Sequence, residues 1–420
     1  MKKITLIVLF IFTVNHLKAQ DQLGLEECYN LVTKNFPTAK QSEYYATKNA
    51  LDLDVIKTDK LPKVDFSAQA TYQSDVTHMP ISIPNSTVEP PNKDQYKATV
   101  TVNQLIYSGG LINASEKAKT EELKTQQKQV EVNLYQLKKQ VNQLYFTALL
   151  IQEKTALLHA KKNQLSTKLK EVKSGIKYGA ILPTSDKILE AELLKIDQQI
   201  YELSLSKSTT LNALSKLIGT PITNETQLKT PEILTSENTE IERPELDLFN
   251  LQKNYLETSE AMISKQNTPK LLGFATGGYG NPGLNMLDNS FQTYYHVGVK
   301  LNWNIFDWNA NKKQRESLLI NKEIINSEEE AFLLNTTIEM DKQHSEIEKL
   351  TKLIETDFTI IDLRKEVVTS AASQLKNGVI TSSAYITEFT NLYEAENDLK
   401  THTIELLQAK ANYNLTKGNF

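Results

Sequence analysis

The chain has 420 residues and a formal net charge of −4 at pH 7. This acidic balance excludes a protein that attracts nucleic acid through bulk positive charge. The single cysteine, Cys28, excludes a disulfide framework and a cysteine-ligated metal cluster, and we expect it to be a buried free thiol.

The first 20 residues predict a signal peptide. Lys2 and Lys3 precede an apolar run from Ile4 to Val14, and Ala19 is a small residue near a suitable cleavage point. The run is too short to cross a membrane as a helix. Removal of residues 1–20 leaves 44 basic and 51 acidic residues, a net charge of −7. No later stretch of about 18 apolar residues occurs, so we expect a periplasmic protein, a secreted protein or an outer-membrane β-barrel.

The mature chain contains an internal repeat. A shift of 199 residues aligns Gly179 with Gly378, and a shift of 207 residues aligns Pro62 with Pro269. The eight additional residues of the first copy fall in the Pro-rich segment 74–94. Two copies of one structural unit would differ in this way, because loops tolerate insertions.

Each repeat is expected to begin with a helical segment and to continue with two strands. In residues 64–73 and 294–305, apolar and polar side chains alternate with period two, which predicts strands with one apolar face. Residues 96–102 alternate in the same way, and residues 270–280 do so less regularly. Strands of about ten residues can cross a bilayer when tilted, although a soluble hairpin would show the same pattern.

Long helices are expected after the strands. From Leu134 to Ile176, apolar side chains recur at alternating spacings of three and four residues, and this pattern resumes from Leu189 to Leu217. Two such heptad runs with a break between them predict an antiparallel coiled-coil hairpin. A helix from about residue 110 to 175 would be on the order of 100 Å long. Apolar residues outside the seam, such as Tyr145 and Phe146, predict packing on both flanks, as in a closed ring of helices.

The two helical hairpins are expected to reverse at glycines, in the segments KYGAILPTSD and KNGVITSSAY. Together these patterns predict a signal peptide (1–20), a first repeat (21–219), a linker (220–242) and a second repeat (243–420). The first repeat would contain a β-hairpin at 64–107 and a helical tip near 177–186, and the second a β-hairpin at 270–306 and a tip near 376–385.

This layout resembles the TolC-like outer-membrane efflux proteins over nearly all of the mature chain. The segments that carry the resemblance are LGLEECYNLVTKNFP, RPEL, the two tips, LEAELLKIDQQIYEL and NLYEAENDLKTHTIELLQAKANYNLTKG. None is specific alone. Their order, in two copies behind a signal peptide, makes the resemblance specific.

The resemblance implies an internally duplicated membrane protein of mixed α and β structure. Family members are homotrimers in which each protomer gives two β-hairpins to a shared 12-stranded β-barrel in outer-membrane lipid. Their long antiparallel coiled-coil helices form an α-barrel tunnel in the periplasm. The tunnel passes substrates from an inner-membrane RND or ABC-type pump, through a periplasmic adaptor protein, in tripartite efflux or type I secretion. No cofactor and no nucleic-acid partner is implied.

The resemblance also implies roles for particular residues. The adaptor-docking tips would consist of Gly179, Ala180, Ile181 and Leu182 and of Gly378, Val379, Ile380 and Thr381. The strand alternation would turn Asp65, Gln69, Lys300 and Asn302 toward the barrel lumen and Phe66, Val297, Val299 and Trp303 toward lipid. The family often narrows the tunnel with aspartates after the second tip, where this chain has Ala384 and Thr387. Asp186 and Glu388 are the nearest acidic candidates for a pore gate.

No pattern in the sequence predicts an enzyme. Five histidines of the mature chain show no metal-ligand spacing, and no HExxH or GxSxG motif occurs. The glycine-rich segment 273–283 lies in a predicted strand and its turn, which excludes a phosphate-binding loop. We therefore predict a non-enzymatic channel. The alternative is a soluble periplasmic coiled-coil adaptor or scaffold protein, and the missing catalytic site disfavours an exported hydrolase.

Overall fold

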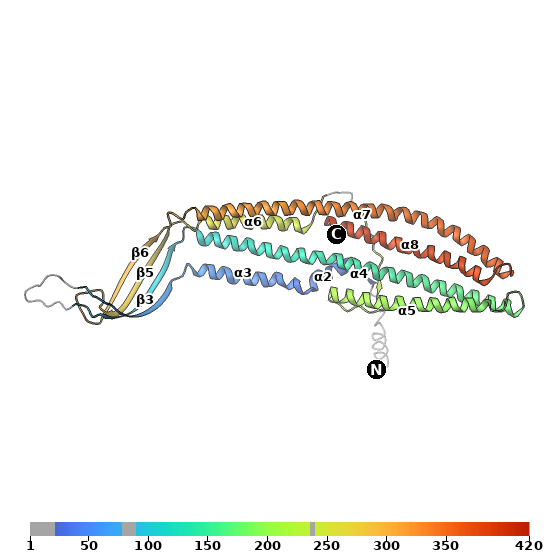
Figure 1. The fold of residues 1–420 in the computed structure, drawn as a ribbon, viewed down its shortest axis with the longest axis horizontal. Helices are drawn as coiled ribbons and strands as arrows, with labels where there is room; N and C mark the ends of the chain where they lie inside the picture. The colour runs from blue at the N-terminus through green and yellow to red at the C-terminus, as the bar shows by residue number, and fades with distance from the viewer. Residues whose placement is uncertain (1–21, 78–89, 236–239, 420) are drawn as a thin grey trace, which may run out of the picture. The chain divides into compact units, whose positions relative to one another are not determined.

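The computed structural model describes residues 22–77, 90–235 and 240–419 (Figure 1). The signal peptide predicted at 1–20 lies outside these residues. The first half of the chain contains β1 (Gln22–Leu23), α2 (Leu25–Asn35), the 3-10 helix Pro37–Lys40, α3 (Gln41–Thr58), β2 (Lys63–Tyr72), β3 (Asp94–Tyr107), α4 (Leu111–Lys177) and α5 (Ser185–Ile218). The second half contains β4 (Gln227–Leu228), α6 (Pro244–Ser264), β5 (Lys270–Asn281), β6 (Gln292–Asn302), α7 (Ala310–Lys376) and α8 (Ser382–Lys417). The order of one helix, two strands and two long helices therefore occurs twice.

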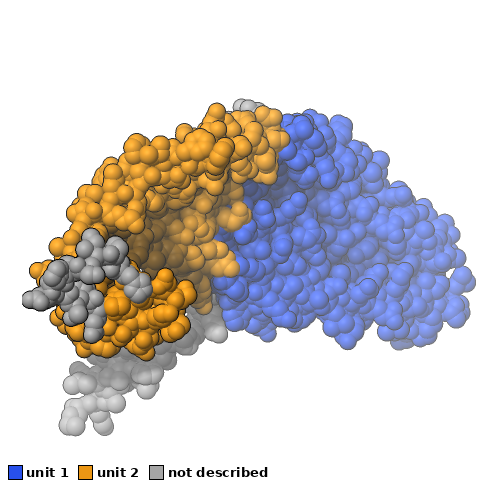
Figure 2. All heavy atoms as spheres, turned by 60° about the vertical axis from the view of Figure 1, so that its left-hand side comes forward, with its two compact units in different colours: residues 1–39, 130–246, 331–420 blue, residues 40–129, 247–330 orange. Residues whose placement is uncertain are grey.

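The chain divides into two compact units (Figure 2). Unit 1 comprises residues 1–39, 130–246 and 331–420, and unit 2 comprises residues 40–129 and 247–330. Each unit thus takes residues from both halves of the sequence, and α4 and α7 each contribute to both units. Of the helices that the structure describes, none has both the length and the hydropathy of a membrane-spanning helix.

Unit 2 contains a four-stranded antiparallel sheet with the strand order β2-β3-β5-β6. In the first hairpin Lys63 pairs with Asn103, and in the second Lys270 pairs with Asn302. Strands β3 and β5 join the two hairpins, with an irregularity in the register next to Leu105. The alternating segments of both repeats therefore form strands of one sheet.

Strand β6 ends earlier than the alternating pattern suggested. The alternation continues to Ile305, but β6 ends at Asn302, so Trp303 lies beyond the strand. The carboxylate of Asp307 accepts hydrogen bonds from the backbone N–H of Asn311 (2.9 Å) and from the side chain of Asn267 (2.5 Å). These bonds hold the turn into α7, which begins at Ala310. Strand β6 ends at Asn302 because its partner Lys270 is the first residue of β5 and follows Pro269, which has no backbone N–H for a further ladder bond.

One core of unit 1 surrounds the middle of α4. Tyr145 and Phe146 are almost fully buried there, together with side chains of α2, α5 and α8. The Tyr145 hydroxyl lies 2.9 Å from the carbonyl oxygen of Leu23 and 2.5 Å from that of Lys229, at the short parallel pairing of β1 with β4. Cys28 is a free, fully buried thiol in the same core, as predicted, and burial raises its pKa to about 12.

A second core of unit 1 lies where the two helical hairpins approach their tips. The heptad seam of α4 supplies residues at intervals of seven, and these pack against α5, α7 and α8 (Figure 1). The buried members are Leu158, Leu165, Val172, Leu189, Ile196, Ala371, Leu375, Tyr385 and Phe389. The predicted seam is therefore the packing surface of both hairpins.

A buried ion pair crosses this second core. The ammonium of Lys161 (α4) lies 3.1 Å from the carboxylate of Glu192 (α5), and the two side chains are 5% and 13% exposed. The same ammonium lies 4.3 Å from the centre of the Tyr393 ring on α8. Lys161 thus links its own helix α4 to α5 and α8, and the Glu192 carboxylate supplies the counter-charge for the buried ammonium.

We expect Glu192→Ala to destabilise unit 1 by about 3 kcal/mol, because it leaves the Lys161 ammonium buried without its counter-ion. The midpoint of thermal denaturation of the purified protein measures the effect. Asp197→Ala is the matched control, since it breaks the neighbouring pair with Lys162 between the same two helices, where the side chains are 38% and 47% exposed. That exposed pair should contribute about 1 kcal/mol or less. Equal losses from the two substitutions would contradict this account.

Candidate functional site

The register of the sheet places the apolar residues of all four strands on one face. Val64 lies opposite Val102, Val102 opposite Ala275, and Ala275 opposite Val297. Directly opposed residues of antiparallel strands point to the same side, so the four alternating patterns are in phase. The large exposed side chains of this apolar face include Val64, Phe66, Tyr72, Tyr96, Val100, Tyr279, Tyr295, Val297, Val299 and Leu301. An exposed apolar surface of this kind marks contact with an apolar partner or with lipid.

The opposite face of the sheet, which we call the polar face, carries the residues that the sequence assigned to water. They are Asp65, Gln69, Lys300 and Asn302. The side chain of Asn103 donates a hydrogen bond to the Asp65 carboxylate (3.2 Å). The polar face is thus hydrogen-bonded between strands and compatible with water.

Each outer strand of the sheet has one unpaired edge within the described chain. Strand β2 pairs only with β3, and β6 pairs only with β5. Each edge presents a row of backbone N–H and C=O groups along ten or eleven residues. Such edges are templates for pairing with another strand, and they are very costly in an apolar environment.

Aromatic side chains occur at both ends of the sheet. Near the loop end, the Phe291 ring lies 6.3 Å from that of Tyr96 and 5.4 Å from that of Tyr279, between ring centres. Near the helical end, Trp303 and Trp308 are 55% and 81% exposed. Two aromatic groups on either side of an apolar band are typical of a sheet that crosses a bilayer.

The two helical tips have the same backbone geometry. Gly179 and Gly378 have φ values of 72° and 68°, in the left-handed region that favours glycine. The N–H of Ala180 donates to the carbonyl of Gly175 (2.8 Å), and an equivalent bond from the N–H of Val379 closes the second tip (2.9 Å). Both α4 and α7 therefore end in a Schellman motif, which requires a residue with positive φ.

The two tips lie side by side and expose apolar side chains. A Cβ atom built on Gly378 would lie 2.9 Å from the carbonyl oxygen of Ala180, so the two turns are in close contact. Ile181 and Ile380 pack into the second core of unit 1, whereas Leu182 (66%) and Val379 (72%) are exposed. The structure thus brings the eight predicted tip residues into one region. Ile181 and Ile380 anchor the tips in the core, and Leu182 and Val379 are accessible at the surface.

The two gate candidates lie in different surroundings. Asp186 is in the first turn of α5, 3.6 Å from the ammonium of Lys187. Glu388 on α8 accepts hydrogen bonds from Arg364 of α7 (3.3 Å) and from Asn391 (3.3 Å). Among the interactions within the described residues, none joins Asp186 to Glu388, so a single chain does not bring them together.

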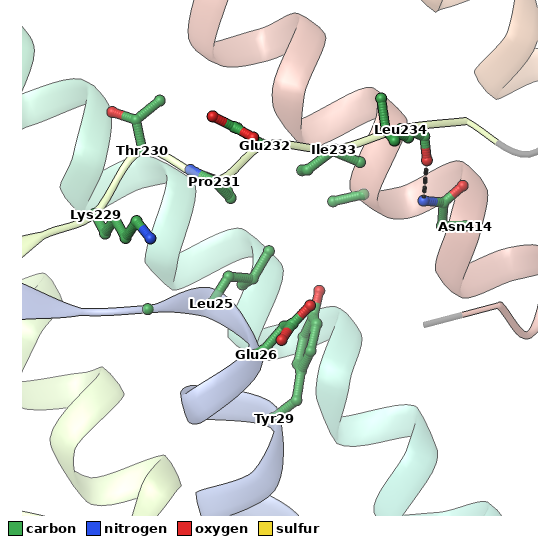
Figure 3. Close-up of a pocket in the computed structure, with 12 residues that line it drawn as sticks. Leu25, Glu26, Tyr29, Lys229, Thr230, Pro231, Glu232, Ile233, Leu234 and Asn414 are labelled. Carbon is green, nitrogen blue, oxygen red and sulfur yellow. Dashed lines mark hydrogen bonds between the residues drawn. The ribbon is translucent and has the colours of Figure 1, made fainter.

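Unit 1 also contains a pocket of about 540 Å³ that the sequence did not indicate. Residues 229–234 run from β4 toward α8 and line it together with Glu26 and Tyr29 of α2 (Figure 3). The side-chain amide of Asn414 donates to the carbonyl of Leu234 (2.9 Å) and fixes the end of this segment. No sequence signal identifies the pocket, because it is formed by a stretch without secondary structure that crosses helices distant in the sequence.

Three lysines of the polar face were also missed by the sequence analysis. Lys63, Lys97 and Lys270 share this face with Lys300, as the register of the four strands shows. The period of two could have placed Lys63 and Lys97 on this face. Lys63 is two residues before Asp65, and Lys97 stands at a polar position of the alternating segment 96–102. Lys270 stands in the segment whose alternation is irregular, so its side was not evident before the pairing with β6 was known.

Comparisons with known proteins agree on the fold. VceC, an outer membrane protein of Vibrio cholerae, matches with a TM-score of 0.67 and 14% identity over 94% of this chain and 96% of that chain. The Campylobacter jejuni outer membrane channel CmeC gives 0.65 and 16% over 94% and 85% of the two chains. The Neisseria gonorrhoeae outer membrane channel MtrE, in its open state, gives 0.66 and 14% over 94% and 89%. At identities this low, the comparisons establish a shared fold.

The sequence of the first half of the chain is similar to that of a known family. Residues 39–220 match the family described as outer membrane efflux protein. No curated protein matches the chain at a significant level. The resemblance seen in the tips and helices is confirmed, and so are the predicted outer-membrane localisation and non-enzymatic function. Residues 39–220 are therefore similar to outer membrane efflux proteins, and the whole chain has the fold of solved outer membrane channels.

Proposed function

We propose that three copies of this chain form a closed 12-stranded barrel. The observation that carries this proposal is the sheet with an exposed apolar face and two unpaired edges. The three pairings β2–β3, β3–β5 and β5–β6 are all antiparallel, so β2 and β6 run in opposite directions. Pairing β6 of one copy with β2 of the next would therefore continue the antiparallel order, and closure would satisfy every edge in lipid.

The two faces of the sheet support an orientation in the membrane. Phe66, Val297 and Val299 on the apolar face would contact lipid. Trp303, which lies just beyond β6, would be located at the membrane–water interface near the helical end. The polar face, with Asp65, Gln69, Lys300 and Asn302, would then line a water-filled lumen.

The long helical hairpins would form a periplasmic tunnel that ends at the paired tips. In this proposal, Gly179, Ala180, Ile181 and Leu182 and the residues Gly378, Val379, Ile380 and Thr381 form the docking surface for a periplasmic adaptor. The exposed apolar side chains at the tips support it, because a helical adaptor can cover them. The channel would accept substrates from an inner-membrane RND or ABC-type pump, in tripartite efflux or type I secretion. Asp186 and Glu388 remain the proposed gate residues.

The alternative of a soluble coiled-coil adaptor makes a different prediction about the sheet. A soluble protein would cover the apolar face with its own residues, whereas Val297 and Tyr295 are 71% and 79% exposed. Fractionation of cells without detergent separates the two. Recovery in the outer-membrane fraction supports the channel, and recovery in the soluble periplasm would contradict it.

We expect Val297→Lys to reduce the amount of trimer in the outer membrane. A lysine at the middle of a lipid-facing strand should destabilise the inserted protein by about 2–4 kcal/mol. The measurement is the amount of trimer that resists dissociation by sodium dodecyl sulfate without heating, in isolated outer membranes.

His296→Lys is the matched control for this substitution. His296 is the neighbouring residue of β6, is also exposed, and lies on the polar face opposite Thr276. The substitution His296→Lys introduces the same positive charge one residue away from Val297, at a position where water would solvate the ammonium group. A loss of trimer from His296→Lys as large as that from Val297→Lys would overturn the proposed orientation.

We expect Leu182→Asp and Val379→Asp to impair adaptor docking and leave the trimer intact. Both side chains are exposed at the tips, so a carboxylate there costs little in the free protein but would be desolvated under an apolar partner. Chemical cross-linking to the adaptor that co-purifies with the wild-type protein should fall several-fold.

Leu234→Asp provides the comparison for the tip substitutions. Leu234 is 88% exposed but lies in the segment after β4, away from the tips in the sequence and in the fold. It should leave cross-linking at the wild-type level. If the tip variants also kept wild-type cross-linking, docking at the tips would be wrong.

A further inference from the structure

We propose that the sheet selects for anions: the polar face forms a positively charged lumen that favours anionic substrates over cationic ones. This inference rests on the proposed trimeric barrel. It concerns the charge of the lumen, which differs in sign from the net charge of the chain. The whole chain is acidic, with a net charge of −4, so a positive lumen is not expected from composition.

The charge of the polar face follows from the strand register. Residues at every second position of β2, β3, β5 and β6 share this face, and the charged ones are Lys63, Asp65, Lys97, Lys270 and Lys300. Four lysines and one aspartate give a net charge of +3. The apolar face carries only Asp94, at the first position of β3 opposite Tyr72. The two faces thus differ in the sign of their charge as well as in polarity.

Three of the lysines lie at the helical end of the sheet. Lys63 is the first residue of β2 and Lys270 the first of β5. Lys270 pairs with Asn302, and Leu272 pairs with Lys300, so Lys270 and Lys300 are diagonal neighbours on adjacent strands. The backbone positions of diagonal neighbours lie about 7–8 Å apart, so the two lysine side chains leave the sheet from adjacent positions of the polar face.

Most of this positive charge is not neutralised inside the chain. Lys63 has Asp59 at 2.8 Å, and Lys97 lies over the Tyr294 ring, which leaves its charge in place. None of the ion pairs between described residues involves Lys270 or Lys300. The only acid of the face, Asp65, accepts a hydrogen bond from Asn103, and its charge acts on Lys63, two residues earlier on the same strand.

Threefold repetition would turn these residues into rings of charge. Rings of Lys or Arg side chains in a pore favour anions, as rings of Asp or Glu favour cations. A low-dielectric wall strengthens the effect, because it concentrates the field in the water of the lumen. The barrel would therefore raise the local concentration of anions in its own lumen, opposite in sign to the acidic gate candidates Asp186 and Glu388 of the helical tunnel.

The test is ion selectivity of the purified full-length trimer in planar lipid bilayers, with different KCl concentrations on the two sides. The reversal potential gives the permeability ratio of chloride to potassium. The triple variant Lys97→Gln, Lys270→Gln, Lys300→Gln should lower this ratio several-fold relative to wild type. Lys63 is left unchanged because Asp59 holds it.

Two further variants control for folding and for the sign of the effect. The triple Lys→Arg variant at the same positions keeps the charge and should keep the wild-type ratio, while Asp65→Asn should raise it. Heat-modifiable trimer on a gel verifies assembly of each variant.

The outcomes separate this inference from the proposed function. Conducting Lys→Gln trimers with a wild-type permeability ratio would overturn the positive lumen and leave the channel intact. A wild-type protein that forms no conducting trimer would overturn the proposed barrel, and the lumen with it.

Discussion

The open edges of β2 and β6 are the constraint on which the rest of the structure depends. Among the described residues, the outer strands β2 and β6, ten and eleven residues long, each have one edge without a strand partner, next to an exposed apolar face. Water would satisfy the edges but not the apolar face, and lipid would satisfy the face but not the edges. In the proposed barrel, joining edges between copies would resolve both conflicts, since the backbone groups would pair while the apolar face remained outside. The internal duplication supplies two hairpins for this purpose.

The helices follow a different physical rule from the strands. Their stability comes from seams buried between neighbouring helices, as at Leu158, Leu165 and Val172, and from charged groups that these seams enclose. The Lys161–Glu192 pair next to Tyr393 ties three helices together close to the tips. The tips themselves depend on Gly179 and Gly378, whose positive φ lets each helix end abruptly and lets the two turns approach closely.

Much of the fold could be predicted because its signals are local. The period of two around Phe66 and Val297 and the heptads from Leu134 onward each specify an element without reference to distant residues. The glycine at each tip could be identified because a reversal between helices demands positive φ. The end of β6 could not, because the alternation continues through Trp303, whereas the partner strand β5 begins only at Lys270, opposite Asn302. The pocket beside residues 229–234 was also missed, since its walls come from segments far apart in the chain.

The sequence by itself determined which segments are strands and helices, which side is apolar in three of the four strands, and that the order of elements occurs twice. These properties depend on the spacing of side chains along a single segment. The tertiary structure alone decided that the two hairpins join into one sheet, that Lys270 shares a face with Lys97 and Lys300, and that the tips touch at Ala180 and Gly378. Those facts depend on register and packing between segments about 200 residues apart, and free energies of pairing and burial set them rather than any local pattern.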